Sequence, residues 1–136
     1  MKRLLIILFF SILLSQEGNS AYLRLELENA IKDINARQFD SAIARIENTN
    51  FSDSEYLNHS LILKMKALHG INDIDQSLSV AKQINRNDLN TNLQTIYSLE
   101  LGDIFSEMGL FDKSFEHYLA ARKSNIDTKA NKRINQ

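Results

Sequence analysis

Residues 97–121 read YSLELGDIFSEMGLFDKSFEHYLAA, and this stretch decides the fold. Leu101 and Phe105 are four residues apart, so they share one face of a helix. Gly109 then interrupts the helical pattern, and a second helix begins at Phe111. Three further residues recur at helical spacing along that second helix: Ser114, Tyr118 and Ala121. We therefore predict two short antiparallel helices joined by a glycine turn.

The turn and second helix of this unit return twice upstream. Phe39-Asp40-Ser41-Ala42, Ile74-Asp75-Gln76-Ser77 and Phe111-Asp112-Lys113-Ser114 follow one scheme, in which a large apolar residue precedes Asp and a small residue comes three positions later. The spacings are 74 − 39 = 35 and 111 − 74 = 37 residues. A period in this range is typical of stacked helical hairpins. We expect the small residue to let the two helices of a pair approach closely, and the large residue to fill the gap between them.

The third unit resembles the tetratricopeptide repeat (TPR) family, whose period is about 34 residues. Leu101 and Gly102 match the family's Leu-Gly pair, and Ser98 and Ile126 replace its tryptophan and proline. The residues that define the repeat across the three units are Phe39, Ala42, Ile74, Ser77, Leu101, Gly102, Phe105, Gly109, Phe111, Ser114, Tyr118 and Ala121. The resemblance covers Tyr22 to Ile126. It implies an all-α fold, a short right-handed α-solenoid of antiparallel helical hairpins, with a generic α-helical bundle as the alternative.

The apolar residues follow a helical period from Tyr22 onward, and the chain contains no proline. We place a repeat domain at residues 21–126, with units at 22–50, 53–86 and 89–124. Ser52 and Glu55 have the spacing of a capping box at the third helix, and Asp73 can cap the fourth. Residues 127–136 are polar, and we expect a tail or a short capping helix opened by Asp127.

The first 20 residues have the pattern of an export signal. Lys2 and Arg3 precede an apolar run over residues 4–14, which is too short for an ordinary membrane span of about 20 residues. We predict a signal peptide at 1–20 and a periplasmic or secreted protein of the bacterial envelope. The alternatives are an uncleaved tether and a buried first helix. Cleavage after Ser15, Ser20 or Ala21 remains open.

The residues that carry most enzyme chemistry are absent or scattered. The chain has no cysteine, and its three histidines, His59, His69 and His117, form no metal-binding motif with carboxylates. Phosphate-binding glycine loops and nucleophile elbows are missing too. The formal net charge is −1 with acids and bases interspersed, which disfavours nucleic-acid binding. We expect no catalytic activity, no metal and no cofactor.

The TPR resemblance also implies a binding face, because the first helix of each pair lines the concave surface in that family. The candidate residues are Glu28, Lys32, Asn35, His59, Ile62, Lys66, His69, Asp103 and Glu107, with Ile96, Leu99 and Ser106 beside them. A mixed groove of this kind could hold a peptide or a helix. The alternative is a solvated helix face without a ligand. The family's carboxylate clamp is not matched, since Glu28, Lys32, Ile96 and Glu100 stand where it would need Lys, Asn and Arg.

Two functions follow from this sequence. The first is an exported adaptor that binds a protein or peptide through its concave face. The second is a structural or accessory subunit, or a shortened input region of a repeat-bearing sensor, that acts by end-to-end stacking or self-association. A small secreted inhibitor or effector is a third class. A C-terminal cap would favour the adaptor, whereas an uncovered apolar face on the Phe111–Ala121 helix would favour assembly.

Overall fold

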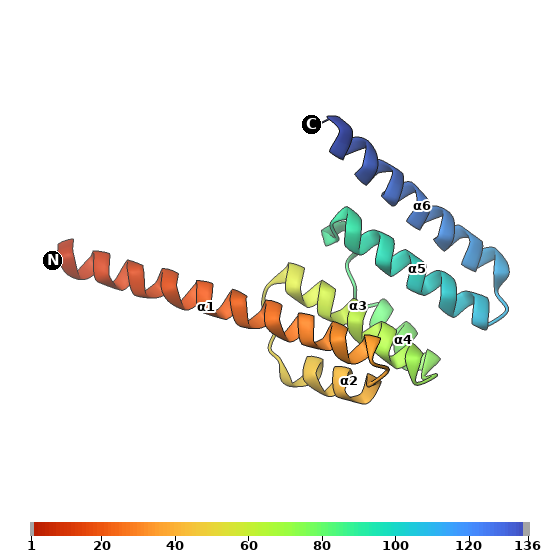
Figure 1. Cartoon of the computed structure of the whole chain (residues 1–136), viewed down its shortest axis with the longest axis horizontal. Coiled ribbons are helices and arrows are strands. Elements are labelled where there is room, and N and C mark those ends of the chain that lie inside the picture. Colours follow the sequence, from red (N-terminus) through yellow and green to blue (C-terminus); the bar gives the residue numbers. More distant parts are fainter. Residues whose placement is uncertain (1, 135–136) are drawn as a thin grey trace.

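The computed structural model describes the backbone of residues 2–134 and the side chains of residues 19–126. Its elements are α1 (Lys2–Asn35), α2 (Phe39–Asn48), α3 (Ser54–Gly70), α4 (Ile74–Ala81), the 3₁₀ turn η1 (Arg86–Asp88), α5 (Thr91–Glu107) and α6 (Phe111–Ile134). Within residues 2–134 there is no strand (Figure 1). The predicted all-α class is confirmed.

The helices pack in consecutive pairs. Helix α1 packs against α2, α3 against α4, and α5 against α6, with a short turn inside each pair (Figure 1). Helix α3 also packs against α1, α2 and α5. It is therefore the central helix, through which the first and third pairs are connected.

The three turns inside the pairs share one backbone conformation. Arg37, Asn72 and Gly109 have left-handed φ values of 59°, 63° and 72°, and these positions are 35 and 37 residues apart. The N–H of the following residue donates to the carbonyl five residues earlier in each case: Gln38 to Asp33 at 2.8 Å, Asp73 to Leu68 at 2.9 Å and Leu110 to Phe105 at 2.8 Å. This is the Schellman arrangement, which closes a helix on a left-handed residue.

Small residues lie where the two helices of a pair touch. The Ser77 hydroxyl donates to the Met65 carbonyl at 2.8 Å, and the Ser114 hydroxyl donates to the Gly102 carbonyl at the same distance. Both bonds join residues twelve apart, and the corresponding residues of the first pair, Ala42 and Ala30, are fully buried. Each hydroxyl exchanges a hydrogen bond to water in the unfolded chain for one to a carbonyl of the neighbouring helix, so its burial costs little free energy.

Two hydrophobic clusters form the interior. The N-terminal cluster lies between α1, α2 and α3 and consists of Leu23, Leu27, Ala30, Ile34, Ala42, Ile46, Phe51, Leu63 and Ala67. The C-terminal cluster lies between α3, α4 and α5 and consists of Ile62, Met65, Leu68, Val80, Ala81, Ile84, Leu89, Leu93, Tyr97, Leu101 and Ile104. Helix α3 contributes to both, which explains its central position.

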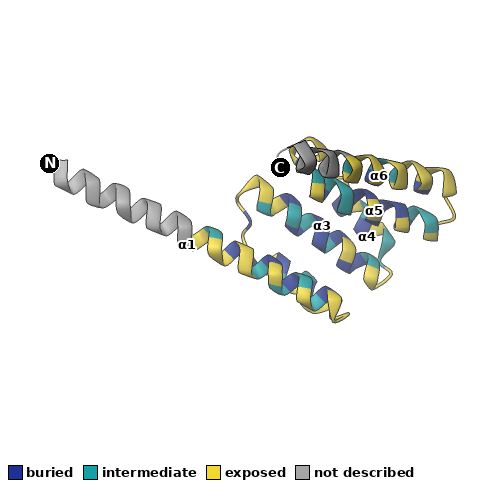
Figure 2. Cartoon of the chain, turned by 45° about the horizontal axis from the view of Figure 1, so that its top comes forward, coloured by how far each residue is buried: buried dark blue, intermediate teal, exposed yellow. Residues whose placement is uncertain are grey.

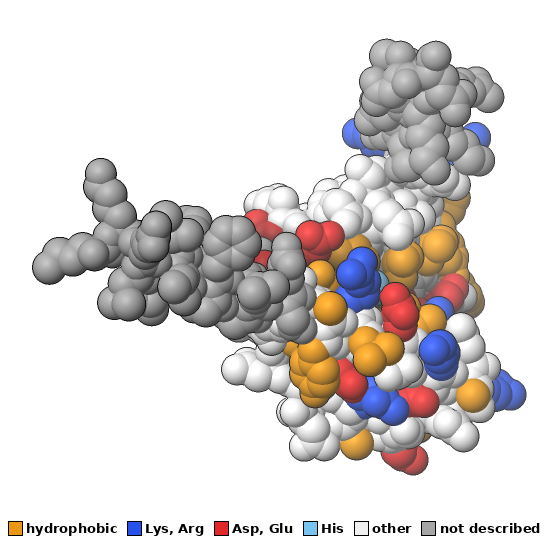
Figure 3. Space-filling model, turned by 60° about the vertical axis from the view of Figure 1, so that its left-hand side comes forward, with side chains coloured by type: hydrophobic (Ala, Val, Ile, Leu, Met, Phe, Trp, Pro, Cys, Tyr) orange, Lys and Arg blue, Asp and Glu red, His pale blue; other side chains and the backbone are white. Residues whose placement is uncertain are grey.

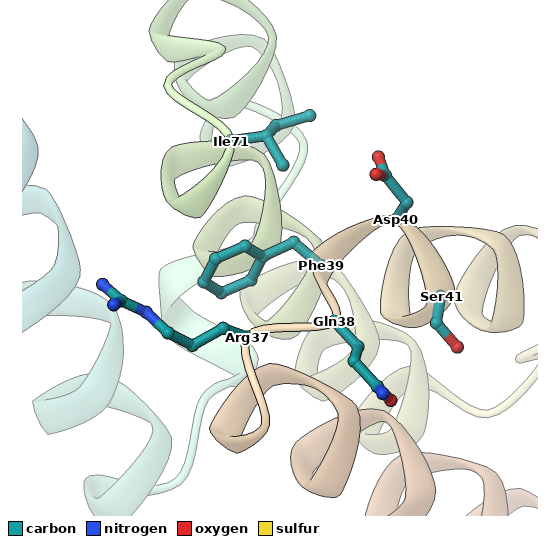
Figure 4. A pocket seen from close by; sticks show the side chains of 6 residues that line it. All are labelled: Arg37, Gln38, Phe39, Asp40, Ser41 and Ile71. Carbon is teal, nitrogen blue, oxygen red and sulfur yellow. The ribbon is translucent and has the colours of Figure 1, made fainter.

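The large residue at the first turn, Phe39, has a different role from the one predicted. Phe39 reaches across the junction between pairs and covers the end of α3 beside Ile71 (Figure 4). A Cβ atom at Gly70 would lie 2.6 Å from the Phe39 ring, so a larger residue at this point would force the ring to move. The residue therefore fills the gap to the following pair rather than the gap inside its own pair. The same turn leaves a shallow depression of about 430 Å³ lined by Arg37, Gln38, Phe39, Asp40, Ser41 and Ile71.

Two predicted boundaries change. Asp53, rather than Ser52, caps α3, since its carboxylate accepts from the Glu55 N–H at 2.9 Å. Helix α6 does not end near Ser124 but continues to Ile134, so residues 127–134 extend α6 instead of forming a separate capping helix. The cap is lost because nothing in 124–128 breaks the helix, and Asp127 lies inside it. Asp73 caps α4 as expected, accepting from the Gln76 N–H at 3.1 Å.

The predicted leader forms the first part of α1, which is one helix from Lys2 to Asn35. The side chains of residues 1–18 lie outside the described part of the chain, so the signal peptide stays a prediction. Where side chains are described, no helix is both long enough and apolar enough to cross a bilayer.

Gly102 provides a test of the packing in the third pair. A Cβ atom there would lie 2.5 Å from the Tyr118 ring, so we expect Gly102→Leu to lower the free energy of unfolding by about 1–3 kcal/mol through overpacking. Thermal and urea denaturation measure the change. The double variant Gly102→Leu with Tyr118→Ala removes the obstructing ring and should recover part of the loss. Equal stability of Gly102→Leu and wild type would contradict this contact.

Candidate functional site

The structure separates the predicted concave residues by exposure. Glu28, Lys32, Asn35, Lys66, Asp103 and Glu107 are exposed, whereas His59 and His69 are half-buried. Ile62 is 0% exposed and belongs to the C-terminal cluster, so its assignment to the binding face is wrong. Ile62 does lie at helical spacing from His59 and Lys66, but its side chain is on the side of α3 that packs into the C-terminal cluster.

The three residues predicted from the first unit occupy a different face from those of the other units. Shifted by the 35-residue period, Glu28, Lys32 and Asn35 correspond to Leu63, Ala67 and Gly70 of α3. Leu63 and Ala67 are buried in the N-terminal cluster, against the preceding pair. Since no pair precedes α1 among the described residues, Glu28, Lys32 and Asn35 form the outer face of α1. They do not continue the row through His59 and Lys66.

His69 connects the second and third pairs through two carboxylates of α5. Its Nδ1 lies 2.6 Å from Glu100 Oε1, and its Nε2 lies 3.1 Å from Glu107 Oε2. The His69 and Glu100 side chains are 13% and 8% exposed, whereas Glu107 is exposed. Glu100 was missed by sequence reasoning. The signal was an acid at the centre of the otherwise apolar stripe Leu93, Tyr97, Glu100 and Ile104.

This bridge is structural in character. Burial opposes a charge on the His69 ring, but the hydrogen bonds that the ring donates to the Glu100 and Glu107 carboxylates outweigh this effect, and the pKa of His69 is raised. Both ring nitrogens face carboxylates of α5, which leaves neither pointing into open solvent. Among the described residues, no three His, Asp or Glu side chains are grouped as a metal ion would require.

A small apolar groove lies between α4, α5 and α6. It has a volume of about 330 Å³ and is lined by Leu78, Ala81, Lys82, Tyr97, Leu101, Phe105 and His117. His117 stacks on Phe105 with ring centroids 5.3 Å apart, and the Lys113 ammonium lies 5.6 Å from the same ring centre. Burial lowers the pKa of His117, with the nearby Arg86 acting in the same direction. His117 therefore packs as a neutral aromatic at one wall of the groove.

Asp103 is tied to the third pair rather than being independent of it. The Tyr118 hydroxyl donates to Asp103 Oδ1 at 2.6 Å, and this hydrogen bond raises the pKa of Tyr118. The bond joins α5 to α6 at the surface. Asp103 thus keeps one carboxylate oxygen on Tyr118 while remaining exposed.

The largest unexpected feature is a row of exposed apolar residues on α6, a helix whose ribbon is coloured mostly as exposed in Figure 2. Phe111, Phe115, Leu119 and Ile126 are 69%, 62%, 46% and 55% exposed, and we call these four residues the α6 stripe. Their spacing places them on one helix face. Phe111 was predicted to fill the third pair, and this prediction is wrong because the contact of its own pair is made by Ser114 and Ala121.

Charge on the molecule is mixed. Figure 3 shows acidic and basic side chains interspersed on one face, with no broad area of a single sign. The side chains drawn there therefore form no extended positively charged surface that could bind a polyanion such as a nucleic acid. The α6 stripe and the apolar groove are the features of the described residues that depart most from an ordinary solvated surface.

Comparison of the chain with protein-family models, with curated proteins and with solved structures finds no match.

The His69 bridge predicts a pH-dependent stability. The pKa of His69 is higher in the folded state than its ordinary value of 6.5, so its contribution is complete below about pH 6.5 and is lost as the pH rises through the folded pKa. We expect the stability difference between wild type and His69→Gln to shrink as the pH rises above about 6.5. Urea denaturation at a series of pH values measures it.

His59 and His117 have lowered pKa values and so act in the opposite sense, but they are present in both proteins and cancel in the difference. A stability difference that stays constant or grows with pH would contradict a charged His69 in this bridge.

Proposed function

We propose that this chain is an exported, non-catalytic protein-interaction module, built as a TPR-like right-handed solenoid of about three antiparallel helix pairs. The repeated features support this class. The left-handed turn residue occurs three times at spacings of 35 and 37 residues, and the serine-to-carbonyl bond occurs at equivalent places in the second and third pairs. Stacked pairs of this kind commonly present extended surfaces to other proteins.

The α6 stripe is the observation that carries the proposal. Large apolar side chains on a helix normally pack against a neighbour, and contiguous exposed patches of several hundred Å² mark interaction sites. The stripe has no neighbour among the described residues, and residues 127–134 extend α6 rather than turn back over it. It therefore favours the structural or accessory subunit, whose terminal face is covered in an assembly, over the adaptor with a capped end.

A specific observation keeps the concave-face adaptor as a second candidate. Leu99 on α5 is a large exposed apolar residue one helical turn from exposed Asp103, and exposed Lys66 of α3 stands 37 residues before Asp103, at the equivalent position of the preceding pair. An apolar centre with a cation and an anion at its edges suits a short peptide or helix. The presence of both surfaces is compatible with a subunit that is anchored at one face and binds at the other.

Export is part of the proposal and rests on the leader. The short apolar run after Lys2 and Arg3 is typical of a signal peptide, and the absence of cysteine means that stability outside the cell depends on packing alone. The periplasm or the medium is the expected location.

Affinity capture tests the function. The C-terminally tagged chain is purified from envelope and medium fractions, and its N-terminus is read by mass spectrometry to establish cleavage. We expect a stoichiometric protein partner that is lost with Phe115→Ser if the end face binds it, or with Lys66→Glu if the concave face does. Both positions are exposed, so the free energy of unfolding of each variant, measured by thermal denaturation, should lie within about 0.5 kcal/mol of the wild-type value.

Lys32→Glu, on the outer face of α1, is the matched control and should retain the partner. Recovery of the chain in the cytoplasm with an intact leader would contradict export. Recovery without a partner other than a second copy of the chain would remove the adaptor.

A further inference from the structure

The exposed α6 stripe has two partly buried counterparts in the same molecule. Phe39 and Ile43 of α2, and Ile74 and Leu78 of α4, occupy the positions that Phe111 and Phe115 occupy in α6. The two residues of α2 and the two residues of α4 pack against the hydrophobic clusters, which continue into the following pair. Phe111 and Phe115 have the same chemistry and the same register, but their surface is open.

We propose that two copies of this chain associate through their α6 stripes, antiparallel to each other, about a two-fold axis near Leu119. This inference deepens the assembly function proposed above and rests on it, because it names the occupant of the exposed end face. It also fixes the symmetry of the assembly. A two-fold pairing closes on itself as a dimer, whereas head-to-tail stacking would continue into a filament.

Head-to-tail stacking is disfavoured by the shape of α1. In the first junction, the Phe39 ring lies against Gly70, where even a Cβ atom would come within 2.6 Å. The corresponding residue on the outer face of α1 is Asn35, and the residue corresponding to the buried Ala67 is Lys32. The α1 face of a second copy would therefore present two larger polar side chains to Phe111. It does not reproduce the surface that receives Phe39.

The charges beside the stripe favour an antiparallel second α6. Asp112 and Glu116 flank its first half, whereas Arg122 and Lys123 flank or interrupt its second half, and all four are exposed. A parallel pairing would place like charges opposite each other. An antiparallel pairing whose axis lies between Leu119 and Ala120 brings Glu116 of one copy opposite Lys123 of the other, and by symmetry this pair occurs twice.

The stripe has the extent that such an interface needs. From Phe111 to Ile126 it spans about 23 Å of helix at about 1.5 Å per residue. Its four side chains are half to two thirds exposed, which amounts to roughly 400 Å² of apolar surface when a large apolar side chain carries about 150–250 Å². Two facing stripes bury roughly 800 Å², and the flanking polar groups bring the total toward the range of about 1,200–2,000 Å² typical of specific interfaces.

Charge reversal tests the arrangement in solution. Sedimentation velocity of the full chain over a range of concentrations gives the dimer dissociation constant for wild type, Glu116→Lys, Lys123→Glu and the double variant. We expect each single reversal to weaken the dimer about tenfold or more, since each turns two attractive pairs into repulsive ones. The double variant restores opposite charges at both pairs and should return to within about threefold of wild type.

Mixing the two single variants provides a second readout. Glu116→Lys presents two cations and Lys123→Glu two anions, so an equimolar mixture should form heterodimers more tightly than either variant forms homodimers. Lys32→Glu on α1 is the control and should leave the dimer unchanged. A monomeric wild type at all concentrations, failure of the double variant to recover, or a loss of association with Lys32→Glu would each overturn the two-fold α6 pairing.

Cysteine cross-linking locates the axis independently. The chain has no native cysteine, so Leu119→Cys introduces a single thiol near the proposed axis, where the partner's thiol comes within disulfide reach. We expect oxidation to give a covalent dimer with Leu119→Cys and none with Lys32→Cys. Absence of the Leu119→Cys dimer would contradict the axis. Recovery of a different protein in the capture experiment by a chain that stays monomeric would overturn this inference while leaving the proposed interaction function intact.

Discussion

The close approach of the two helices within each pair is the contact on which the rest of the structure depends. It requires a residue with little or no side chain at the crossing, and Ala42, Ser77 and Ser114 supply one in the three pairs. The two serines satisfy their hydroxyls on carbonyls of the neighbouring helix, so the approach is close without leaving a polar group unbonded. Because each pair is fixed in this way, the residue at the start of its second helix is left pointing outward, where it can contact the next pair.

The junctions between pairs differ in chemistry, and this difference shapes the function. The first is apolar, with Phe39 seated against Gly70. The second relies in part on the His69 bridge to Glu100 and leaves a groove between α4, α5 and α6. At the third position the same apolar residues, Phe111 and Phe115, have nothing to cover among the described residues. Among the described residues the third of these positions is therefore open, which is the physical basis for the assembly proposed here.

Sequence patterns predicted the elements that depend on neighbouring residues. The turn at Gly109, the cap at Asp73, the small residue at Ser114 and the starts of α2, α4 and α6 all follow from spacing over a few residues. The failures involve residues that are far apart. Ile62 fits a row with His59 and Lys66, but its burial depends on α4 and α5 closing over it. Glu100 forms its bond only because α5 packs beside α3, and no local pattern pairs it with His69.

By itself the sequence determined that the chain is helical, where most helices begin and end, and that the units recur every 35 to 37 residues. These properties arise from backbone conformation and helical period, which act over a few residues. Only the tertiary structure decided which faces are covered: the burial of Ile62, the bridge at His69 and the exposure of the α6 stripe. Burial depends on how neighbouring pairs are placed: Phe39 and Phe111 occupy the same place in the local pattern, but Phe39 is partly buried against α3, whereas Phe111 has no following pair among the described residues and is exposed.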